Sequence, residues 1–420
     1  MSGLLIAAVR DLDPPAGGAE MSLATLLKGV GIPGPLAADA PAYIPLEPSP
    51  DIPDTALVQG WSVSALQSGA RGTPTELTED SQIARWALDL PVEDLWSGLA
   101  WRLSEKSGQP RRWLQRRHLR KANARFAKAI DAHISTILGS QRDAGSPVVG
   151  VTQLHWSAGA AERFTAHGVP YVVFVRDELQ FRHPGIYRSS LEGAAAVCCA
   201  GAGLGEQVQV AATFDVKAVR NVRLPVDFAG RFGSAAVVNG MRKVGLSARS
   251  EEGDLDVPRI TIVGVTPEKG SAFYQRLLPH LAAAWPEAHI DVHGGGSYAE
   301  ALGRFSNTTW HGHTPVEEVL SRADVHMLTF ASTGSWGRVV NEAGLFGVPT
   351  VSIATGSQPE AVGEGGIVVS ADAGLDDWVS ALKQAHAERD SLGEMAREHC
   401  GIVDHRRSIA AFRSVLDEVA

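Results

Sequence analysis

Cysteine is scarce in this chain: there are three in 420 residues, and two of them, Cys198 and Cys199, are adjacent. So few thiols exclude a disulfide framework, and their spacing does not fit a zinc site. Long apolar runs are also absent. Residues 1–9 hold an apolar stretch shorter than the core of a signal peptide, with no basic leader, and no later run could span a bilayer. We therefore expect a cytoplasmic protein.

An excess of positive charge is missing as well, because the net charge is -9 and the isoelectric point lies near 5.9. Proteins that bind nucleic acid over most of their surface carry a net positive charge, so we expect no nucleic-acid partner. The chain has 44% hydrophobic and 20% charged residues, a globular composition. Its length is sufficient for two or three domains.

The chain starts with a strand, a glycine loop and a helix. Residues 4–9 form an apolar run, and Gly17-Gly18 precedes the helix. This order is typical of a doubly wound parallel sheet, and the two glycines let the backbone approach a ligand, although the G-x-G-x-x-G fingerprint is absent. Asp11 and Asp13 offer an alternative, a divalent metal under a diphosphate. Such acid pairs are frequent by chance, and we expect no bound metal.

Residues 78–138 lack an alternating pattern and predict a helical insertion in the first domain. Between residues 111 and 128 there are eight basic residues and no acidic one, alongside an apolar stripe of Leu119, Ala122, Phe126 and Ile130. Such a helix can lie peripherally on the inner face of a membrane, grip an anionic acceptor, or be an ordinary solvated face. The pattern leaves these three alternatives open.

Polar side chains follow the strands that come next in the chain. Strands are predicted at 148–152 and 171–175, separated by a helix. Ligands of parallel sheets bind at the carboxyl ends of strands, so four residues there are candidate acceptor contacts: His155, Arg176, Asp177 and His183. Each also fits a surface position, and Arg176 and Asp177 fit a local ion pair.

The second half repeats the alternation of strand and helix more clearly. A strand at 260–263 leads into Pro267-Glu268-Lys269-Gly270, and a later strand leads into His311-Gly312-His313. The chain therefore divides into a first domain at 1–230, a linker at 231–258, a second domain at 259–400, and a C-terminal helix at 401–420 that packs back on the first domain.

Residues 333–353 predict a loop, a helix, a tight stop and a strand. Gly334 and Gly337 leave the backbone free before the helix, and Gly347 with Pro349 ends it. Such a turn points backbone N–H groups and the positive end of the helix dipole at one spot, which suits a phosphate. Glu342 would repel a diphosphate, so it suits ribose hydroxyls, or it pairs with Arg338 on an ordinary connection.

Together these motifs resemble the retaining GT-B glycosyltransferases of the family-4 type. The resemblance rests on Pro267-Glu268-Lys269-Gly270, on His311-Gly312-His313 and on residues 336–349, and it is clear over about 260–370. It implies two Rossmann-like domains facing a cleft, with a nucleotide-sugar donor as substrate and neither metal nor cofactor. The donor contacts that it implies, with the glycine loop included, are Gly17, Gly18, Lys269, His311, Gly312, His313, Gly334, Ser335, Trp336, Gly337, Arg338 and Glu342.

The resemblance also assigns roles. Lys269 would contact the diphosphate, Glu342 the ribose, and these two are the candidate catalytic residues. The first domain would bind the acceptor. Two positions depart from the family pattern: Gly334 stands where a glutamate is common, and Val265 where an arginine is common. Arg338 and Arg176 are candidate replacements for the missing cation.

We therefore expect a retaining, metal-independent glycosyltransferase of the hexosyltransferase type, with donor base, sugar and acceptor unspecified. A catalytically silent nucleotide-sugar binder or partner subunit is the main alternative, because Gly334 and Val265 depart from the pattern. A GT-B enzyme that epimerises or hydrolyses the nucleotide sugar is a further one.

Overall fold

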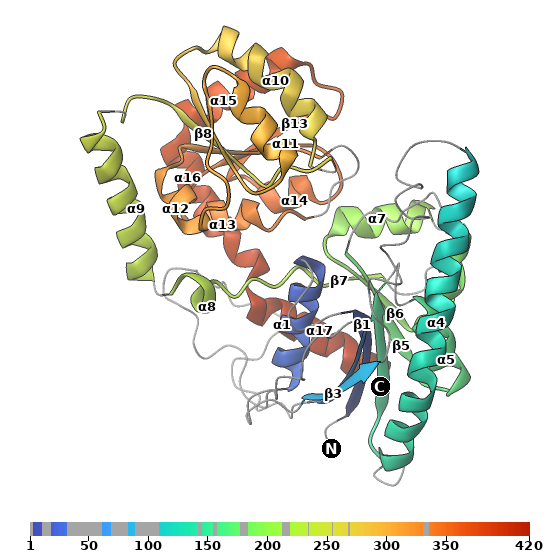
Figure 1. Ribbon diagram of the computed structural model, residues 1–420. Coiled ribbons are helices and arrows are strands. Elements are labelled where there is room, and N and C mark those ends of the chain that lie inside the picture. The colour runs from blue at the N-terminus through green and yellow to red at the C-terminus, as the bar shows by residue number, and fades with distance from the viewer. Residues whose placement is uncertain are drawn as a thin grey trace. The chain divides into compact units, whose positions relative to one another are not determined.

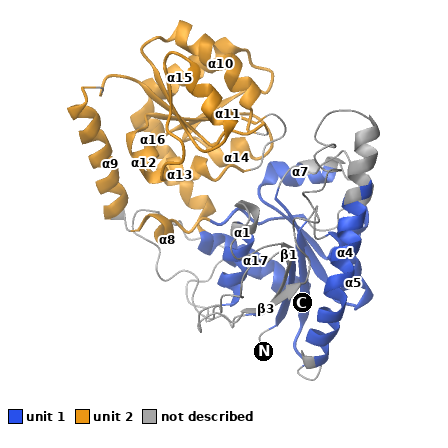
Figure 2. Ribbon diagram, viewed as in Figure 1, with its two compact units in different colours: residues 1–38, 50–225, 405–420 blue, residues 39–49, 226–404 orange. Residues whose placement is uncertain are grey.

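The computed structural model describes residues 3–10, 18–31, 61–68, 83–88, 109–141, 145–153, 158–176, 184–211, 219–233, 235–253, 255–267, 269–330 and 336–420. The chain forms two compact units (Figures 1 and 2). The described residues up to 225, together with 405–420, belong to unit 1, and residues 226–404 belong to unit 2.

Unit 1 is built on a seven-stranded parallel sheet with the order β3-β2-β1-β4-β5-β6-β7. Its strands are β1 (Leu4–Arg10), β2 (Ser62–Ser68), β3 (Ile83–Leu88), β4 (Val148–Gln153), β5 (Tyr171–Val175), β6 (Ala196–Cys199) and β7 (Val219–Asn221). Its helices are α1 (Gly18–Gly31), α4 (Gln109–Gln141), α5 (Ala158–Ala166), α6 (Pro184–Glu192), α7 (Ala202–Ala211) and α17 (His405–Val419). The strand β5 is buried along its whole length, as expected for a parallel strand covered on both faces.

Unit 2 carries a six-stranded parallel sheet with the order β10-β9-β8-β11-β12-β13. The strands are β8 (Arg259–Val263), β9 (His289–His293), β10 (Thr308–Trp310), β11 (Val325–Leu328), β12 (Thr350–Ile353) and β13 (Gly366–Val369). The helices are α8 (Phe228–Phe232), α9 (Ala235–Glu251), α10 (Ser271–Ala284), α11 (Ser297–Glu300), α12 (Val316–Arg322), α13 (Val339–Leu345), α14 (Gln358–Val362), α15 (Leu375–Ala387) and α16 (Arg389–His399), with 3-10 turns η2 (Ala301–Arg304) and η3 (Cys400–Val403).

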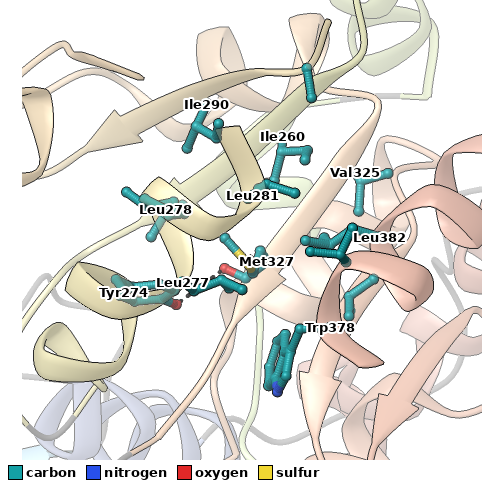
Figure 3. Close-up of a cluster of buried hydrophobic side chains, with 14 of the residues drawn as sticks. Ile260, Tyr274, Leu277, Leu278, Leu281, Ile290, Val325, Met327, Trp378 and Leu382 are labelled. Atoms are coloured by element: carbon teal, nitrogen blue, oxygen red, sulfur yellow. Dashed lines mark hydrogen bonds between the residues drawn. The ribbon is translucent and has the colours of Figure 1, made fainter. Parts of the chain in front are cut away.

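The core of unit 2 lies between its sheet and the helices α10 and α15 (Figure 3). Ile260 and Ile290 from the sheet are fully buried against Leu277 and Leu281 of α10, and Trp378 of α15 closes the cluster. The apolar residues of the strands alternate with polar ones, so one face of each strand supplies this core. This packing holds the strands that carry the loops of the candidate site.

The fold confirms two doubly wound parallel-sheet domains, and in each sheet the strand order reverses beside the first strand of that domain. The expectation of a purely helical insertion at 78–138 is wrong, because residues 83–88 form β3 and pair in parallel with β2. Residues 83–88 form a strand because their backbone pairs with β2, and the local sequence pattern gives no sign of that pairing. The helix α4 connects β3 to β4 and packs on α5.

The expected linker at 231–258 also differs from the structure. Most of it is the helix α9, which packs on α12, and the units part after residue 225. Arg249 of α9 is 1% exposed and donates to Asp324 Oδ1 at 2.9 Å. Residues 235–251 of the expected linker thus form a helix that a buried ion pair anchors. At the other end, Ile409 and Phe412 of α17 join the core of unit 1.

Candidate functional site

The loops that follow β8 and β11 meet at the point where the strand order of unit 2 reverses. Strands β8 and β11 are neighbours, while their connections leave toward opposite sides of the sheet. In doubly wound sheets this switch point, at the carboxyl ends of the strands, is where ligands bind. Lys269 lies in the loop after β8, and Gly337 and Arg338 lie just before α13, after β11.

The stretch at 333–353 has the predicted succession of loop, helix, stop and strand over its described part, 336–353. Gly337 has φ +71° and Gly347 has φ +68°, conformations that favour glycine. A Cβ at Gly337 would lie 2.8 Å from Leu328 Cδ2, so this loop passes close to the end of β11. Gly334 and Ser335 lie outside the described residues.

Trp336 is fully buried, so its indole serves the fold and does not face a ligand. The indole Nε1 donates to Asn341 Oδ1 at 2.7 Å, and Gln358 Nε2 donates to the Trp336 carbonyl at 2.8 Å. Gln358 is held in turn by the Ser352 hydroxyl at 2.9 Å. This chain of bonds fixes the start of α13 to β12 and α14.

The first turn of α13 uses several of its own backbone donors. The helix has seven residues, and the N–H groups of Val340, Asn341 and Glu342 donate to the carbonyls of Gly337 and Arg338 at 2.9 to 3.1 Å. Two of the donors that a helix start leaves free, the N–H groups of Val340 and Asn341, are therefore used within the turn. The charged groups of the site are side chains.

Glu342 lies among three basic side chains. Its carboxylate is 4% exposed, and its Oε1 lies 2.6 Å from Arg231 Nη1 and 3.5 Å from Arg338 Nη2. Burial lowers the pKa of Lys269, and the charge of Glu342 opposes this shift, as it also does for Arg338. We call Arg231, Lys269, Arg338 and Glu342 the cationic cluster; with all four ionised it carries a net charge of about +2.

The loop after β8 positions Lys269. Gly264 has φ +72°, and a Cβ there would come within 3.0 Å of Lys269 Nζ, so the ammonium group lies over this glycine. The Lys269 N–H donates to Thr266 Oγ1 at 3.2 Å, which shapes the turn. The charge of Lys269 also reaches His326 of β11. Burial lowers the pKa of His326 to about 3, and the charge of Lys269 adds to this shift.

Arg231 was not predicted, because it falls in the expected linker. Asp227 caps the short helix α8 by accepting from the Gly230 N–H at 2.7 Å. Phe232 packs edge-on against Phe346, with ring centroids 5.6 Å apart. These contacts fix the backbone beside Arg231 and direct its guanidinium to Glu342, 111 residues further along the chain. Asp227 could have been recognised in the sequence as a helix N-cap, but no local pattern indicates that Arg231 pairs with Glu342.

His311 belongs to a second polar group in unit 2. Its Nε2 lies 2.6 Å from Asp291 Oδ1, and Arg259 Nη1 donates to Asp291 Oδ2 at 2.9 Å. Burial opposes ionisation of Asp291, but the hydrogen bond from His311 and the charge of Arg259 outweigh it and hold its pKa below the usual range. The rings of His293 and His311 stack with centroids 4.6 Å apart.

These residues line a cavity of about 430 Å³ between the strands β8 to β10 and the helix α12. Its walls are polar except for Val319. Of the motif His311-Gly312-His313, His311 lines the cavity and the other two residues do not. Gly312 has φ +67°, and its carbonyl accepts from the Gly294 N–H at 2.7 Å. His313 lies against Gly295, where a Cβ would come within 2.3 Å of Nε2.

Most of the candidate contacts in the first domain lie outside the described residues: Gly17, His155, Asp177 and His183, with Asp11 and Asp13 of the metal alternative. Gly18 begins α1. Arg176 is 6% exposed at the end of β5, with its guanidinium 4.3 Å above the Phe174 ring. Arg176 belongs to unit 1.

The apolar stripe of α4 is used inside unit 1. Leu119, Phe126 and Ile130 are each at most 2% exposed, and α4 packs on α5. The described basic side chains of this helix, Arg117, Arg120, Lys121, Arg125 and Lys128, are exposed. Insertion of the apolar stripe into a membrane is therefore incompatible with this packing, and only the basic face is available to a partner.

Within the described part of the chain, no group of three histidine, cysteine or acidic side chains is arranged to hold a metal ion. In the same part, no helix is both long and apolar enough to cross a membrane.

Comparison with known proteins places this geometry in context. Residues 257–388 match the family described as Glycosyl transferases group 1. No curated protein matches the chain by sequence. Solved structures match over nearly its whole length. Sucrose-phosphate synthase from Thermosynechococcus elongatus has a TM-score of 0.64 at 15% identity, covering 99% of this chain and 98% of its own.

Two further structures agree. Anabaena HepE in complex with UDP has a TM-score of 0.61 at 14% identity, covering 99% of this chain and 100% of its own. The trehalose 6-phosphate synthase of Burkholderia multivorans has a TM-score of 0.62 at 13% identity, covering 100% of this chain and 99% of its own. The chain therefore has the GT-B fold, and the match to Glycosyl transferases group 1 lies within its second unit.

Proposed function

We propose that this protein is a glycosyltransferase that moves a sugar from a nucleotide diphosphate sugar to an acceptor bound by unit 1. One observation carries the proposal. The carboxylate of Glu342, near the loops after β8 and β11, forms ion pairs with Arg231 and Arg338 and interacts with the charge of Lys269. An excess of cations suits a diphosphate, and a carboxylate among them suits the hydroxyls of a ribose.

The proposed chemistry assigns a role to two residues. As the bond from the sugar to the diphosphate breaks, negative charge grows on the departing phosphate oxygens. Lys269 stabilises that charge more in the transition state than in the ground state, which is the condition for catalysis. Glu342 accepts hydrogen bonds from the ribose hydroxyls and orients the donor. Both residues act without a bound metal, and we propose that a hexose is transferred with retention of the anomeric configuration.

The proposal is tested first by donor binding and then by turnover. A thermal-shift panel of UDP, GDP, ADP and TDP identifies the base, because a ligand at one hundredfold its dissociation constant adds about 2.7 kcal/mol to the stability. UDP-glucose is the first sugar donor to try, since Anabaena HepE was solved with it. Release of the nucleotide diphosphate is then followed by chromatography, and NMR of the product reports the anomeric configuration.

The expected result is saturable binding of one nucleoside diphosphate and release of that diphosphate from its sugar conjugate. No thermal response to any of the four nucleotides at millimolar concentration would refute the donor site. Mass analysis of the products separates transfer from epimerisation, which leaves the mass of the nucleotide sugar unchanged.

One observation favours the second candidate, a catalytically silent nucleotide-sugar binder. Val265 is 3% exposed and belongs to the apolar core of unit 2, so this position brings no cation to the loop. Slow hydrolysis of the bound nucleotide sugar without acceptor distinguishes the two candidates. A binder shows none, whereas a transferase releases the diphosphate at a low rate that Lys269→Ala removes.

For the acceptor we propose an anionic molecule or surface that meets the exposed basic face of α4. Binding of the whole protein to vesicles with and without anionic lipid, at two salt concentrations, tests this face, because contacts of exposed charges weaken with added salt. Equal binding to neutral and anionic vesicles would contradict the proposal.

A further inference from the structure

Arg231 contributes to the cationic cluster from a different element than its other members. Lys269 lies after β8, and Arg338 and Glu342 lie at the start of α13, whereas Arg231 lies on α8 near the beginning of unit 2. The shortest ion pair of the cluster is nevertheless the one between Arg231 Nη1 and Glu342 Oε1, at 2.6 Å. The most distant residue in sequence thus makes the closest contact with the carboxylate.

The exposures of the two partners differ. The Arg231 side chain is 37% exposed and the Glu342 side chain 4% exposed. Arg338 is intermediate at 20% and also contacts Glu342 Oε1, from the same helix. Arg231 is therefore the more solvent-accessible of the two arginines that pair with this carboxylate.

A ribose diol that binds both oxygens of the Glu342 carboxylate competes with Arg231 for Oε1. If Arg231 moves to a phosphate oxygen, Arg338 still holds the carboxylate from one turn away on α13. The exchange replaces one charge-assisted contact by another, so it costs little electrostatic energy.

We propose that Arg231 is a donor-binding residue that pairs with Glu342 in the free protein and transfers to the diphosphate when the donor binds. This inference rests on the proposed function. The backbone beside Arg231 stays in place through the Asp227 cap and the packing of Phe232 on Phe346, so only the guanidinium has to move. When the contact between Arg231 and Glu342 breaks, the Glu342 carboxylate becomes available to the ribose in the same step.

If Arg231 moves to the diphosphate, its substitution should have a different effect from that of a residue that only positions Glu342. Arg231→Gln removes a phosphate contact and also removes the competitor of the ribose. We expect the affinity for a nucleoside diphosphate to fall at least tenfold, an amount consistent with the loss of one charged hydrogen bond. The affinity for the corresponding nucleoside should stay the same or rise. Arg231→Lys should fall between Arg231→Gln and the unmodified protein, since it keeps the charge without the forked donor geometry.

The control is Arg304→Gln. Arg304 stands over Phe305 at 5.2 Å, the same distance at which Arg231 stands over Phe232, but its place is on η2, away from Glu342. We expect this variant to bind nucleotides like the unmodified protein. Thermal unfolding of each variant without ligand checks that unit 2 remains folded.

The experiment is calorimetric titration of the full chain with whichever of UDP, GDP, ADP and TDP it binds, and with the nucleoside of the same base. Equal losses of affinity for diphosphate and nucleoside in Arg231→Gln would show that Arg231 only positions Glu342, and would overturn the inference. An unchanged diphosphate affinity would do so as well. If the unmodified protein binds none of the four nucleotides, the proposed function itself fails, a result that the variants cannot imitate.

Discussion

The ion pair between Arg249 and Asp324 gives the sharpest test of how unit 2 is held together. Asp324 Oδ1 accepts from Arg249 Nη1 at 2.9 Å, and Oδ2 accepts from the Arg259 N–H at 2.9 Å. The Arg249 side chain is 1% exposed and the Asp324 side chain 7% exposed. The pair therefore ties α9 to the start of β8, the strand that leads to the Lys269 loop.

Asp324→Asn keeps the shape of this side chain and removes its charge. The Arg249 guanidinium then stays buried with its carbonyl partners, among them Val257 O at 2.8 Å, but without a compensating anion. Breaking a buried pair in this way costs about 3 to 5 kcal/mol. We expect the unfolding free energy of unit 2 to fall by that amount, while nucleotide binding persists at temperatures where the unit is folded.

The assay is urea unfolding, with Asp376→Asn as the matched control. Asp376 lies 2.7 Å from His280 Nε2, yet its side chain is 91% exposed, so its loss should cost at most about 1 kcal/mol. A loss below about 1 kcal/mol for Asp324→Asn, or losses of equal size for both variants, would refute the argument that burial makes the inner pair essential.

Three further predictions concern the site and its surroundings. Lys269→Ala and Glu342→Gln should each lower the rate of transfer at least about a hundredfold at saturating donor, measured as nucleotide release, and full turnover in either would contradict the assigned role. Burial, with the neighbouring imidazole of His311 adding to it, lowers the pKa of His293 to about 4. Histidines of the unfolded chain titrate near 6.5, so between pH 4 and 6.5 the unfolded chain binds more protons than the folded protein. The contribution of His293 to the unfolding free energy should then fall by up to about 3 kcal/mol as the pH drops from 6.5 to 4, and urea titrations should show a weaker fall in His293→Asn; an equal fall would count against this source. Gly337→Ala should cost about 1 to 3 kcal/mol in thermal unfolding because of the positive φ and the contact with β11, whereas Gly240→Ala in α9, where a Cβ meets nothing within 4 Å, should stabilise by up to about 1 kcal/mol.

Local patterns were sufficient for the doubly wound domains and for part of the candidate site. A parallel strand buried on both faces is a continuous apolar run, and the helix that follows has its own period, so the alternation can be read without knowing the partners of each strand. Lys269, Gly337 and Glu342 lie in short motifs beside such strands. Because the carboxyl ends of parallel strands share one edge of the sheet, their proximity followed from the order of the elements.

Contacts between segments that are far apart in the sequence could be identified only in the tertiary structure. The chain itself indicated two α/β domains, a long basic helix, and a Lys269 and a Glu342 at one sheet edge. It did not indicate that 83–88 pairs as β3, that Trp336 is enclosed by protein, or that Arg231 reaches Glu342 across 111 residues. Strand pairing, enclosure and ion pairing all depend on which surfaces the fold brings together, and a local period of two or of 3.6 residues carries no information about that.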